Sequence, residues 1–197
     1  MNLLKLGEDR VIVTARLQLI PIEQQHREAF ARGKSVLGAA LNVTVPHGWP
    51  QFAEAYLPFA AESGDSAASE WQSYFFIHQQ EKVLVGSGGF YGEPDAESVV
   101  EIGYEIATEY WNKGFGTESV RGLINYAFAH EAVQAVRAHT LAEPNASNRL
   151  LQKVGMRHIS SHVDPDVGQV WRWQINRQTH EQRGFLPARL MWHGSLY

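Results

Sequence analysis

Apolar residues recur along this chain with two different periods. Within residues 115–130 they fall at i, i+3, i+4, i+7 and i+8, which predicts a helix with one apolar face that ends near His130. Residues 98–106 alternate between apolar and polar positions instead, as in a strand with two distinct faces. One face carries Val100, Ile102, Tyr104 and Ile106, and the other carries Glu101, Gly103 and Glu105.

The remaining segments predict an alternation of helices and strands. Their patterns and breaker residues predict helices over 23–32, 34–41 and 50–62, and strands over 11–20, 71–78, 82–91 and 135–141. Short connections make 71–78, 82–91 and 98–106 a three-stranded meander. The fold class that follows is α/β (α+β), a mixed sheet packed against helices.

A Gly-rich turn, W-N-K-G-F-G-T-E, joins the strand at 98–106 to the helix that follows. Gly114 and Gly116 lack a Cβ, and the first N–H groups of a helix have no partner within it, so the turn is suited to bind phosphate. It is not a Walker loop, because Lys113 precedes the first glycine, and Ser119 breaks the dinucleotide pattern. A plain turn at the start of a helix is the alternative.

The surroundings of this turn favour the ligand-binding interpretation. The strand, the turn with its tryptophan, the helix, the strand at 135–141 and the run N-x-S-x-R-x-x-x-K-x-G-M at 145–156 resemble the GNAT superfamily of acetyl-CoA-dependent N-acetyltransferases. With T-A-R-L-Q-L-I-P at 14–21, the chain looks most like the Rim-type branch, whose known members acetylate N-terminal amines of ribosomal proteins. The resemblance covers roughly residues 11–175. It implies a mixed, mostly antiparallel central sheet flanked by helices on both faces.

The same resemblance implies how acetyl-CoA, the co-substrate, is held without a metal. The pantetheine amide would pair with the backbone of Tyr104, Glu105 and Ile106. The pyrophosphate would lie on the turn, formed by Trp111, Asn112, Lys113, Gly114, Phe115, Gly116 and Thr117. Asn145 and Asn148 complete the expected CoA contacts, and Ser147 or Asn148 would reach the thiolate or the pantetheine.

Two positions depart from the superfamily pattern. Trp111 stands three residues before the first loop glycine, where the wider superfamily has Gln or Arg. Leu151 stands where many relatives have a tyrosine that acts as general acid. The resemblance therefore supplies no tyrosine acid.

The chemistry needs a base, because an amine with a pKa of about 8 to 10 is largely protonated at pH 7. We expect Glu101 to be that base, with Gly103 leaving open space between it and Glu105. The alternative is that Glu101 belongs to a solvated strand face. Ser147 is a second catalytic candidate, although a serine there also suits the N-cap of a helix. The chain has no cysteine, so we expect direct transfer in a ternary complex.

Three further patterns have a structural and a functional interpretation. The loop P-H-G-W-P at 46–50 places Trp49 either as a wall that selects the acceptor or as a plug at the edge of the core. The run G-S-G-G at 86–89 lacks the first glycine of a nucleophile elbow, which favours a close-packed strand. His158 and His162 would share one strand face, but nothing in the sequence has the spacing of a metal site.

Composition narrows the partners. With 197 residues, we expect one domain over 1–175 and a C-terminal extension of unknown role over 176–197. A net charge of −4 argues against nucleic acid, and no apolar run reaches about 18 residues, which argues against a membrane span. The first ten residues do not form a signal peptide, so we expect a cytoplasmic protein. We also expect a monomer or a homodimer.

The acceptor is expected to be an amine at the N-terminus of a protein or peptide. Two alternatives remain open: a small-molecule amine acetylated on the same fold, and a non-catalytic module that binds acyl-CoA.

Overall fold

The structure is a computed structural model that describes residues 10–51 and 71–184. Within these residues one eight-stranded sheet has the order β1-β2-β3-β4-β5-β6-β8-β7. Its strands are β1 (Ile12–Val13), β2 (Leu17–Pro21), β3 (Ser73–His78), β4 (Val83–Phe90), β5 (Val99–Ile106), β6 (Ala135–Leu141), β7 (Arg157–Asp164) and β8 (Gly168–Asn176). The helices are α1 (Gln24–Ala31), α2 (Lys34–Leu41), the 3-10 turn η2 (Thr108–Tyr110), α4 (Phe115–Ala129), α5 (Ala146–Lys153) and α6 (Arg177–Gln182).

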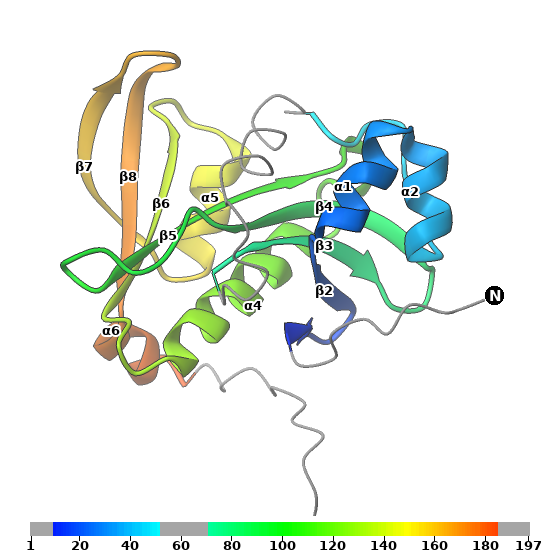
Figure 1. Cartoon of the computed structure of the whole chain (residues 1–197). Coiled ribbons are helices and arrows are strands. Elements are labelled where there is room, and N and C mark those ends of the chain that lie inside the picture. Colours follow the sequence, from blue (N-terminus) through cyan, green and yellow to red (C-terminus); the bar gives the residue numbers. More distant parts are fainter. Residues whose placement is uncertain (1–9, 52–70, 185–197) are drawn as a thin grey trace, which may run out of the picture.

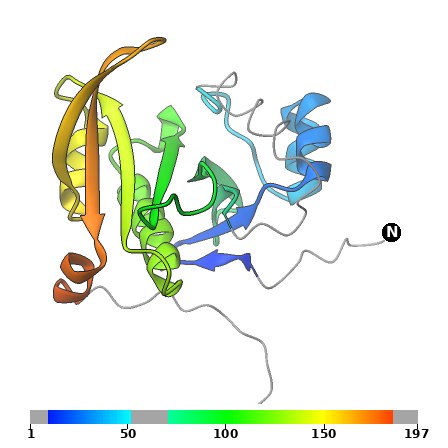
Figure 2. The same cartoon turned by 60° about the vertical axis from the view of Figure 1, so that its left-hand side comes forward.

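Every neighbouring pair of strands is antiparallel except β5 and β6, which are parallel. Helices α1 and α2 lie side by side near β2 and β3, while α4 crosses the other face of the sheet (Figures 1 and 2). The predicted fold class is confirmed: a mixed, mostly antiparallel sheet with helices on both faces.

Alternating strand residues build two apolar cores, one on each face. In β3, Tyr74 and Phe76 pack with the apolar face of α4, whereas Phe75 and Ile77 pack beneath α1 and α2. The alternation predicted for β5 holds in the same way, because Val100 is fully buried on the α4 side. This division matters for function, since polar residues of β5 are left on the face opposite α4.

Most predicted elements agree with the structure to within a few residues, the usual uncertainty of helix and strand ends. The prediction of one strand over 11–20 is wrong: a turn at residues 14–16 divides it into β1 and β2, which pair with each other. The Thr14 amide donates to the Leu17 carbonyl (2.9 Å) and closes that turn. The helix predicted over 50–62 lies almost entirely outside the described residues.

The predicted domain boundary at 175 stays a prediction. Helix α6 begins directly after β8, and Nε2 of its His180 donates a 2.8 Å hydrogen bond to Oδ1 of Asn125 on α4. The ring of His180 also lies 4.8 Å from that of Phe128. The first part of the expected extension is therefore attached to the body of the fold.

Candidate active site where β5 and β6 diverge

The parallel pairing of β5 and β6 stops halfway along both strands. Residues 99–102 of β5 pair with residues 135–138 of β6, and beyond that point each strand pairs only with its other neighbour in the described chain. Figure 1 shows β5 and β6 running apart from there. We call residues 103–106 the open edge of β5, because their backbone on this side has no strand partner among the described residues.

Backbone groups at the open edge can be assigned by alternation along the strand. The Glu101 carbonyl accepts from Tyr91 and the Ala107 amide donates to Val85, so odd-numbered residues face β4. Tyr104 and Ile106 therefore face the side where β6 leaves. The Ile106 carbonyl already accepts from the Trp111 indole (2.7 Å) and from the side-chain amide of Gln51 (3.1 Å). This leaves the Tyr104 backbone groups and the Ile106 amide available to pair with an extended ligand.

The Gly-rich turn follows this edge and ends at the first turn of α4. Gly114 is the N-cap, with φ of 83°, and no side chain caps the helix. Asn112 is also left-handed, at φ 59°. Among the described residues, the amides of Phe115, Gly116 and Thr117 have no hydrogen-bond partner. Amides of this kind at a helix start can bind an anion, as the sequence predicts for this turn.

The two loop glycines have different roles. A Cβ on Gly114 would meet nothing closer than Arg16 Nη2, at 3.4 Å, so this glycine is required by its left-handed backbone. A Cβ on Gly116 would lie 2.7 Å from Leu150 and 3.3 Å from Ile106. Gly116 is thus needed for the packing of α4 against α5 and β5.

Helix α5 begins close to the Gly-rich turn, but the side chain of its own N-cap residue caps it. The Asn145 side chain accepts from the Asn148 amide at 2.9 Å, which makes Asn145 the N-cap. The interpretation of Ser147 as the cap is therefore wrong, because the helix starts two residues earlier. The Asn148 side chain is buried and donates to the Glu143 carbonyl (2.6 Å). Whether Asn145 and Asn148 also contact CoA stays a prediction.

A tyrosine hydroxyl that the sequence did not identify lies at the open edge. The Tyr104 hydroxyl is buried and makes no hydrogen bond within the described chain. Burial raises the pKa of Tyr104, and the neighbouring Ser147 side chain lowers it by less. A tyrosine that keeps its proton thus lies beside Ser147, although the family resemblance supplied no tyrosine acid because Leu151 departs from the pattern.

Glu101 lies on the face opposite α4, as predicted, and its side chain is 35% exposed. Its Oε1 is 2.8 Å from Nδ1 of His139 on β6. Arg172 of β8 donates to Nε2 of the same ring at 3.2 Å. Because arginine can only donate, Nε2 is an acceptor and Nδ1 carries the proton that Glu101 accepts. His139 and Arg172 were not identified from the sequence, since the pairing spans strands distant along the chain.

Two expectations on this face are wrong. The space over Gly103 is not open, because a Cβ there would collide with the ring and hydroxyl of Tyr91. His158 and His162 do not share a face: a bulge after His158 places its ring against Trp171 and Trp173, whereas the ring of His162 lies 5.1 Å from that of His139. An extra residue in a strand moves the following side chains to the other face.

Glu105 is buried and structurally engaged. Its carboxylate accepts from the Ser87 hydroxyl (3.1 Å) and from the backbone amide of Gln51 (2.9 Å). Ser87 in turn accepts from the Trp49 indole at 2.8 Å, and Trp49 is 3% exposed. Trp49 is thus the core plug and not a wall exposed to the acceptor. Ser87 is not a nucleophile at an elbow, since Cβ atoms on Gly86 and Gly88 would collide with β5, as in a close-packed strand.

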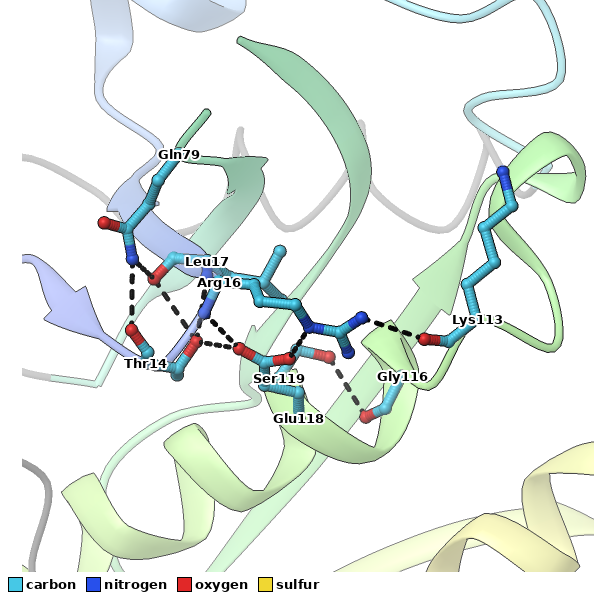
Figure 3. Close-up of polar contacts among 8 residues, drawn as sticks. All are labelled: Thr14, Arg16, Leu17, Gln79, Lys113, Gly116, Glu118 and Ser119. Atoms are coloured by element: carbon cyan, nitrogen blue, oxygen red, sulfur yellow. Dashed lines mark hydrogen bonds and ion pairs between the residues drawn. The ribbon is translucent and has the colours of Figure 1, made fainter. Parts of the chain in front are cut away.

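One further group of residues braces the Gly-rich turn. Arg16, in the turn between β1 and β2, pairs with Glu118 of α4 (2.7 Å) and donates from Nη1 to the Lys113 carbonyl (3.1 Å), as Figure 3 shows. The sequence identified the segment 14–21 as part of a family pattern but did not place it beside the turn.

Neither a metal-binding group nor a membrane-spanning helix is found among the described residues. No group of three or more His, Cys, Asp or Glu residues there is arranged to hold a metal ion. Likewise, none of the helices described is both long and apolar enough to cross a bilayer.

Known proteins resemble this chain in sequence. Two N-acetyltransferases of Bacillus subtilis named as uncharacterized align with it. YjdG is 26% identical over 74% of this chain and 88% of its own length. YoaA is 31% identical over 49% of this chain, and the match spans only 61% of YoaA.

Solved structures share the fold at low sequence identity. The ribosomal alpha-N-protein acetyltransferase RimL, in complex with coenzyme A, superimposes with a TM-score of 0.63 at 15% identity, covering 84% of this chain and 97% of RimL. A chimera of the spermidine N-acetyltransferase SpeG from Vibrio cholerae and hSSAT gives 0.62 at 17% identity, covering 86% and 100%. A GNAT-family acetyltransferase from Bacillus anthracis gives 0.59 at 20%, covering 85% and 99%.

The sequence profile of the acetyltransferase (GNAT) domain matches residues 16–157, which include the Gly-rich turn, the open edge of β5 and the start of α5. The family uses acetyl-CoA and acts on amines, and the uncapped start of α4 beside an open strand edge fits that cofactor. On this evidence the chain belongs to the GNAT family and is an acetyltransferase.

Proposed function

We propose that this enzyme transfers an acetyl group from acetyl-CoA to the N-terminal amine of a protein or peptide, by direct attack in a ternary complex. The observation that carries the proposal is the position of Glu101. Its partly exposed carboxylate lies on the face opposite α4, one residue before β5 and β6 part. An amine approaching a thioester held at the open edge would meet this carboxylate.

The contact with His139 orients Glu101 for the role of base. The imidazole donates from Nδ1 and fixes one carboxylate oxygen, while Arg172 fixes the imidazole. The other carboxylate oxygen, Oε2, makes no hydrogen bond to the described residues and is available to take a proton from the amine, directly or through a water molecule. A carboxylate fully enclosed in an ion pair would have favoured the non-catalytic module instead.

Acetyl-CoA, when bound, supplies a thioester carbon that an uncharged amine can attack. The backbone of Tyr104 and Ile106 would pair with the pantetheine, and the turn at 111–117 would hold the pyrophosphate. Ser147 and the neighbouring Tyr104 hydroxyl would donate a proton to the departing sulfur. That donation is the less demanding half of the reaction, since a thiol has a pKa of about 8.5.

The preference for a protein or peptide N-terminus rests on two likenesses. The segments at 14–21 and 111–118 resemble the Rim-type branch, and RimL shares the fold. The runner-up is a small-molecule amine, favoured by the equally good superposition of the spermidine acetyltransferase SpeG.

Release of free CoA thiol from acetyl-CoA, measured with a panel of amines, tests the proposal. The panel contains peptides with a free N-terminus, the same peptides with a blocked N-terminus and an internal lysine, and spermidine. We expect the highest kcat/KM with free N-termini and a large loss on blocking. Activity with spermidine alone would support the runner-up, and CoA binding without any thiol release would support the non-catalytic module.

Substituting Glu101→Gln tests the base. We expect kcat to fall by roughly 10² to 10⁴-fold, the usual effect of removing a general base, with CoA affinity unchanged. The defect should shrink as pH rises, because more of the acceptor then arrives deprotonated. Glu131→Gln, on an exposed carboxylate after α4, is the matched control. A Glu101→Gln enzyme with wild-type kcat at every pH would remove Glu101 from catalysis.

A further inference from the structure

The turn at residues 14–16 meets the first turn of α4 through one carboxylate. Glu118 accepts from the Thr14 hydroxyl (2.6 Å), the Arg16 amide (2.6 Å) and Arg16 Nε (2.7 Å). Figure 3 shows all three donors converging on this side chain. Only 14% of the Glu118 side chain is exposed. Contacts of this kind fix the turn more firmly than a single surface ion pair, because hydrogen bonds to a charged and largely buried group are the stronger ones.

The turn is also braced from behind. The Gln79 amide group donates to the carbonyls of Thr14 and Leu17, each at 3.0 Å, and the Gln79 backbone amide donates to the Arg16 carbonyl at 2.9 Å. Gln79 lies in the connection between β3 and β4, and Figure 3 shows its side chain reaching the carbonyls of Thr14 and Leu17. The backbone that carries Arg16 is thus held on two sides before its side chain reaches the loop.

The guanidinium of Arg16 spans the Gly-rich turn. Nη1 donates to the carbonyl of Lys113 (3.1 Å), and the guanidinium carbon lies 4.3 Å above the ring of Phe115. These two residues flank Gly114, the N-cap of α4. Nη2 makes no hydrogen bond to the described residues and lies next to Gly114. A positive charge from a distant segment is therefore placed at the start of α4.

We propose that Arg16 is a positioning residue for CoA: it holds the turn at 111–117 in its anion-binding shape and adds positive charge beside the pyrophosphate. Arg16 would supply, from the turn between β1 and β2, the side-chain donor that Trp111 does not provide within the loop. The proposal rests on the use of acetyl-CoA but is independent of which amine is acetylated.

A merely structural role makes a different prediction. If Arg16 only stabilised the fold, its loss would affect every ligand equally. If Arg16 positions the turn at 111–117, its loss weakens the binding of ligands that carry the pyrophosphate and leaves the binding of pantetheine unchanged. The two roles are therefore separated by truncating the ligand rather than by measuring stability alone.

The test compares Arg16→Gln with wild type in binding of CoA, dephospho-CoA and pantetheine, measured by calorimetry or by competition without an acceptor. We expect about a tenfold loss of affinity for CoA and for dephospho-CoA, and no change for pantetheine. With an accepted amine, KM should rise for acetyl-CoA and not for S-acetylpantetheine. Arg121→Gln, which removes an exposed guanidinium from α4, is the matched control and should bind like wild type.

Three results would overturn the proposal: equal losses for CoA and pantetheine, no loss for CoA, or a loss confined to CoA and absent with dephospho-CoA. The last would place Arg16 on the 3′-phosphate instead of the pyrophosphate loop. Should Arg16→Gln fail to fold, Arg16→Lys keeps the charge but not the fork that joins Glu118 to Lys113, and an intermediate, pyrophosphate-dependent loss is expected. Because binding needs no acceptor, these results stand even if the proposed acceptor is wrong.

Discussion

Two helices begin beside the open edge of β5, and they begin in different ways. Helix α5 is closed by its own sequence, since the Asn145 side chain accepts from the Asn148 amide. Helix α4 starts from Gly114 at φ 83° with no side-chain cap. In α5 a side chain accepts from one of the first backbone amides, whereas no side chain does so at the start of α4.

The difference is the one expected if the start of α4 binds an anion. A polar cap at the start of α4 would stabilise the free protein by about 1 kcal/mol but would occupy the amides that a phosphate needs. The chain has glycine there instead, and the contacts of Arg16 with Glu118 and with the Lys113 carbonyl hold the turn in place. Five predictions test this comparison, from the largest expected effect to the smallest.

Gly114→Asp should have the largest effect, a loss of CoA affinity of about 100-fold or more. The residue must adopt a left-handed backbone, and its carboxylate would repel the pyrophosphate. Gly114→Ala separates the two causes: the backbone strain of about 1 to 2 kcal/mol alone corresponds to roughly tenfold. Calorimetry with CoA measures both, and equal affinity in all three proteins would refute the anion site.

Gly116→Val is the contrasting change at the second glycine. Because its side chain would collide with Leu150, we expect a loss of thermal stability along with any loss of CoA binding. A variant that kept its stability and lost only CoA affinity would show that Gly116 also faces the ligand.

The side chains beside the start of α5 should affect turnover rather than CoA affinity. We expect Tyr104→Phe and Ser147→Ala each to lower kcat by up to about tenfold, since the loss of one hydrogen bond at the sulfur corresponds to about 1 kcal/mol. The double variant should lose more than either single one. If the double variant turned over like wild type, neither hydroxyl would donate a proton to the leaving group.

Asn145→Ala should lower the free energy of unfolding by about 1 kcal/mol, the usual effect of removing an N-cap. Chemical denaturation measures this loss, and calorimetry with CoA tests the expected ligand contact separately. Asn145→Asp keeps the capping oxygen and serves as the control. A large loss of CoA affinity in Asn145→Ala would show that the cap is also a ligand contact.

The smallest effect should be a dependence of stability on pH through Glu118. Burial raises the pKa of Glu118, but the hydrogen bonds from Thr14 and Arg16 and the charge of Arg16 outweigh it and lower the pKa below its ordinary value of 4.5. A lowered folded-state pKa means that the stabilisation is present above pH 4.5 and is lost as pH falls through the folded value. The stability difference between wild type and Glu118→Gln should therefore be constant near neutral pH and shrink in acid.

Denaturation curves at neutral and acidic pH measure this difference, with Glu131→Gln as the control. A difference that grew on acidification would contradict the assignment, because it would require the carboxylate to be favoured in its protonated form by the fold.

Local pattern was enough to predict most of the elements around the site. The alternation in 98–106 assigned the faces of β5, and the spacing in 115–130 assigned α4, because both depend only on the geometry of one element. The prediction of one strand over 11–20 was wrong because the turn at 14–16 is held not only by its own hydrogen bonds but also by Glu118 and Gln79, which are distant along the chain.

Short motifs were enough to predict the Gly-rich start of α4, the two faces of β5 and the family resemblance. Which side chains meet could be learned only from the folded structure. Glu118 pairs with Arg16 across 102 positions and Glu101 with His139 across 38, and Trp49 is buried against Ser87. Such pairs depend on the order of strands in the sheet and on where β5 and β6 part, and no local period encodes either.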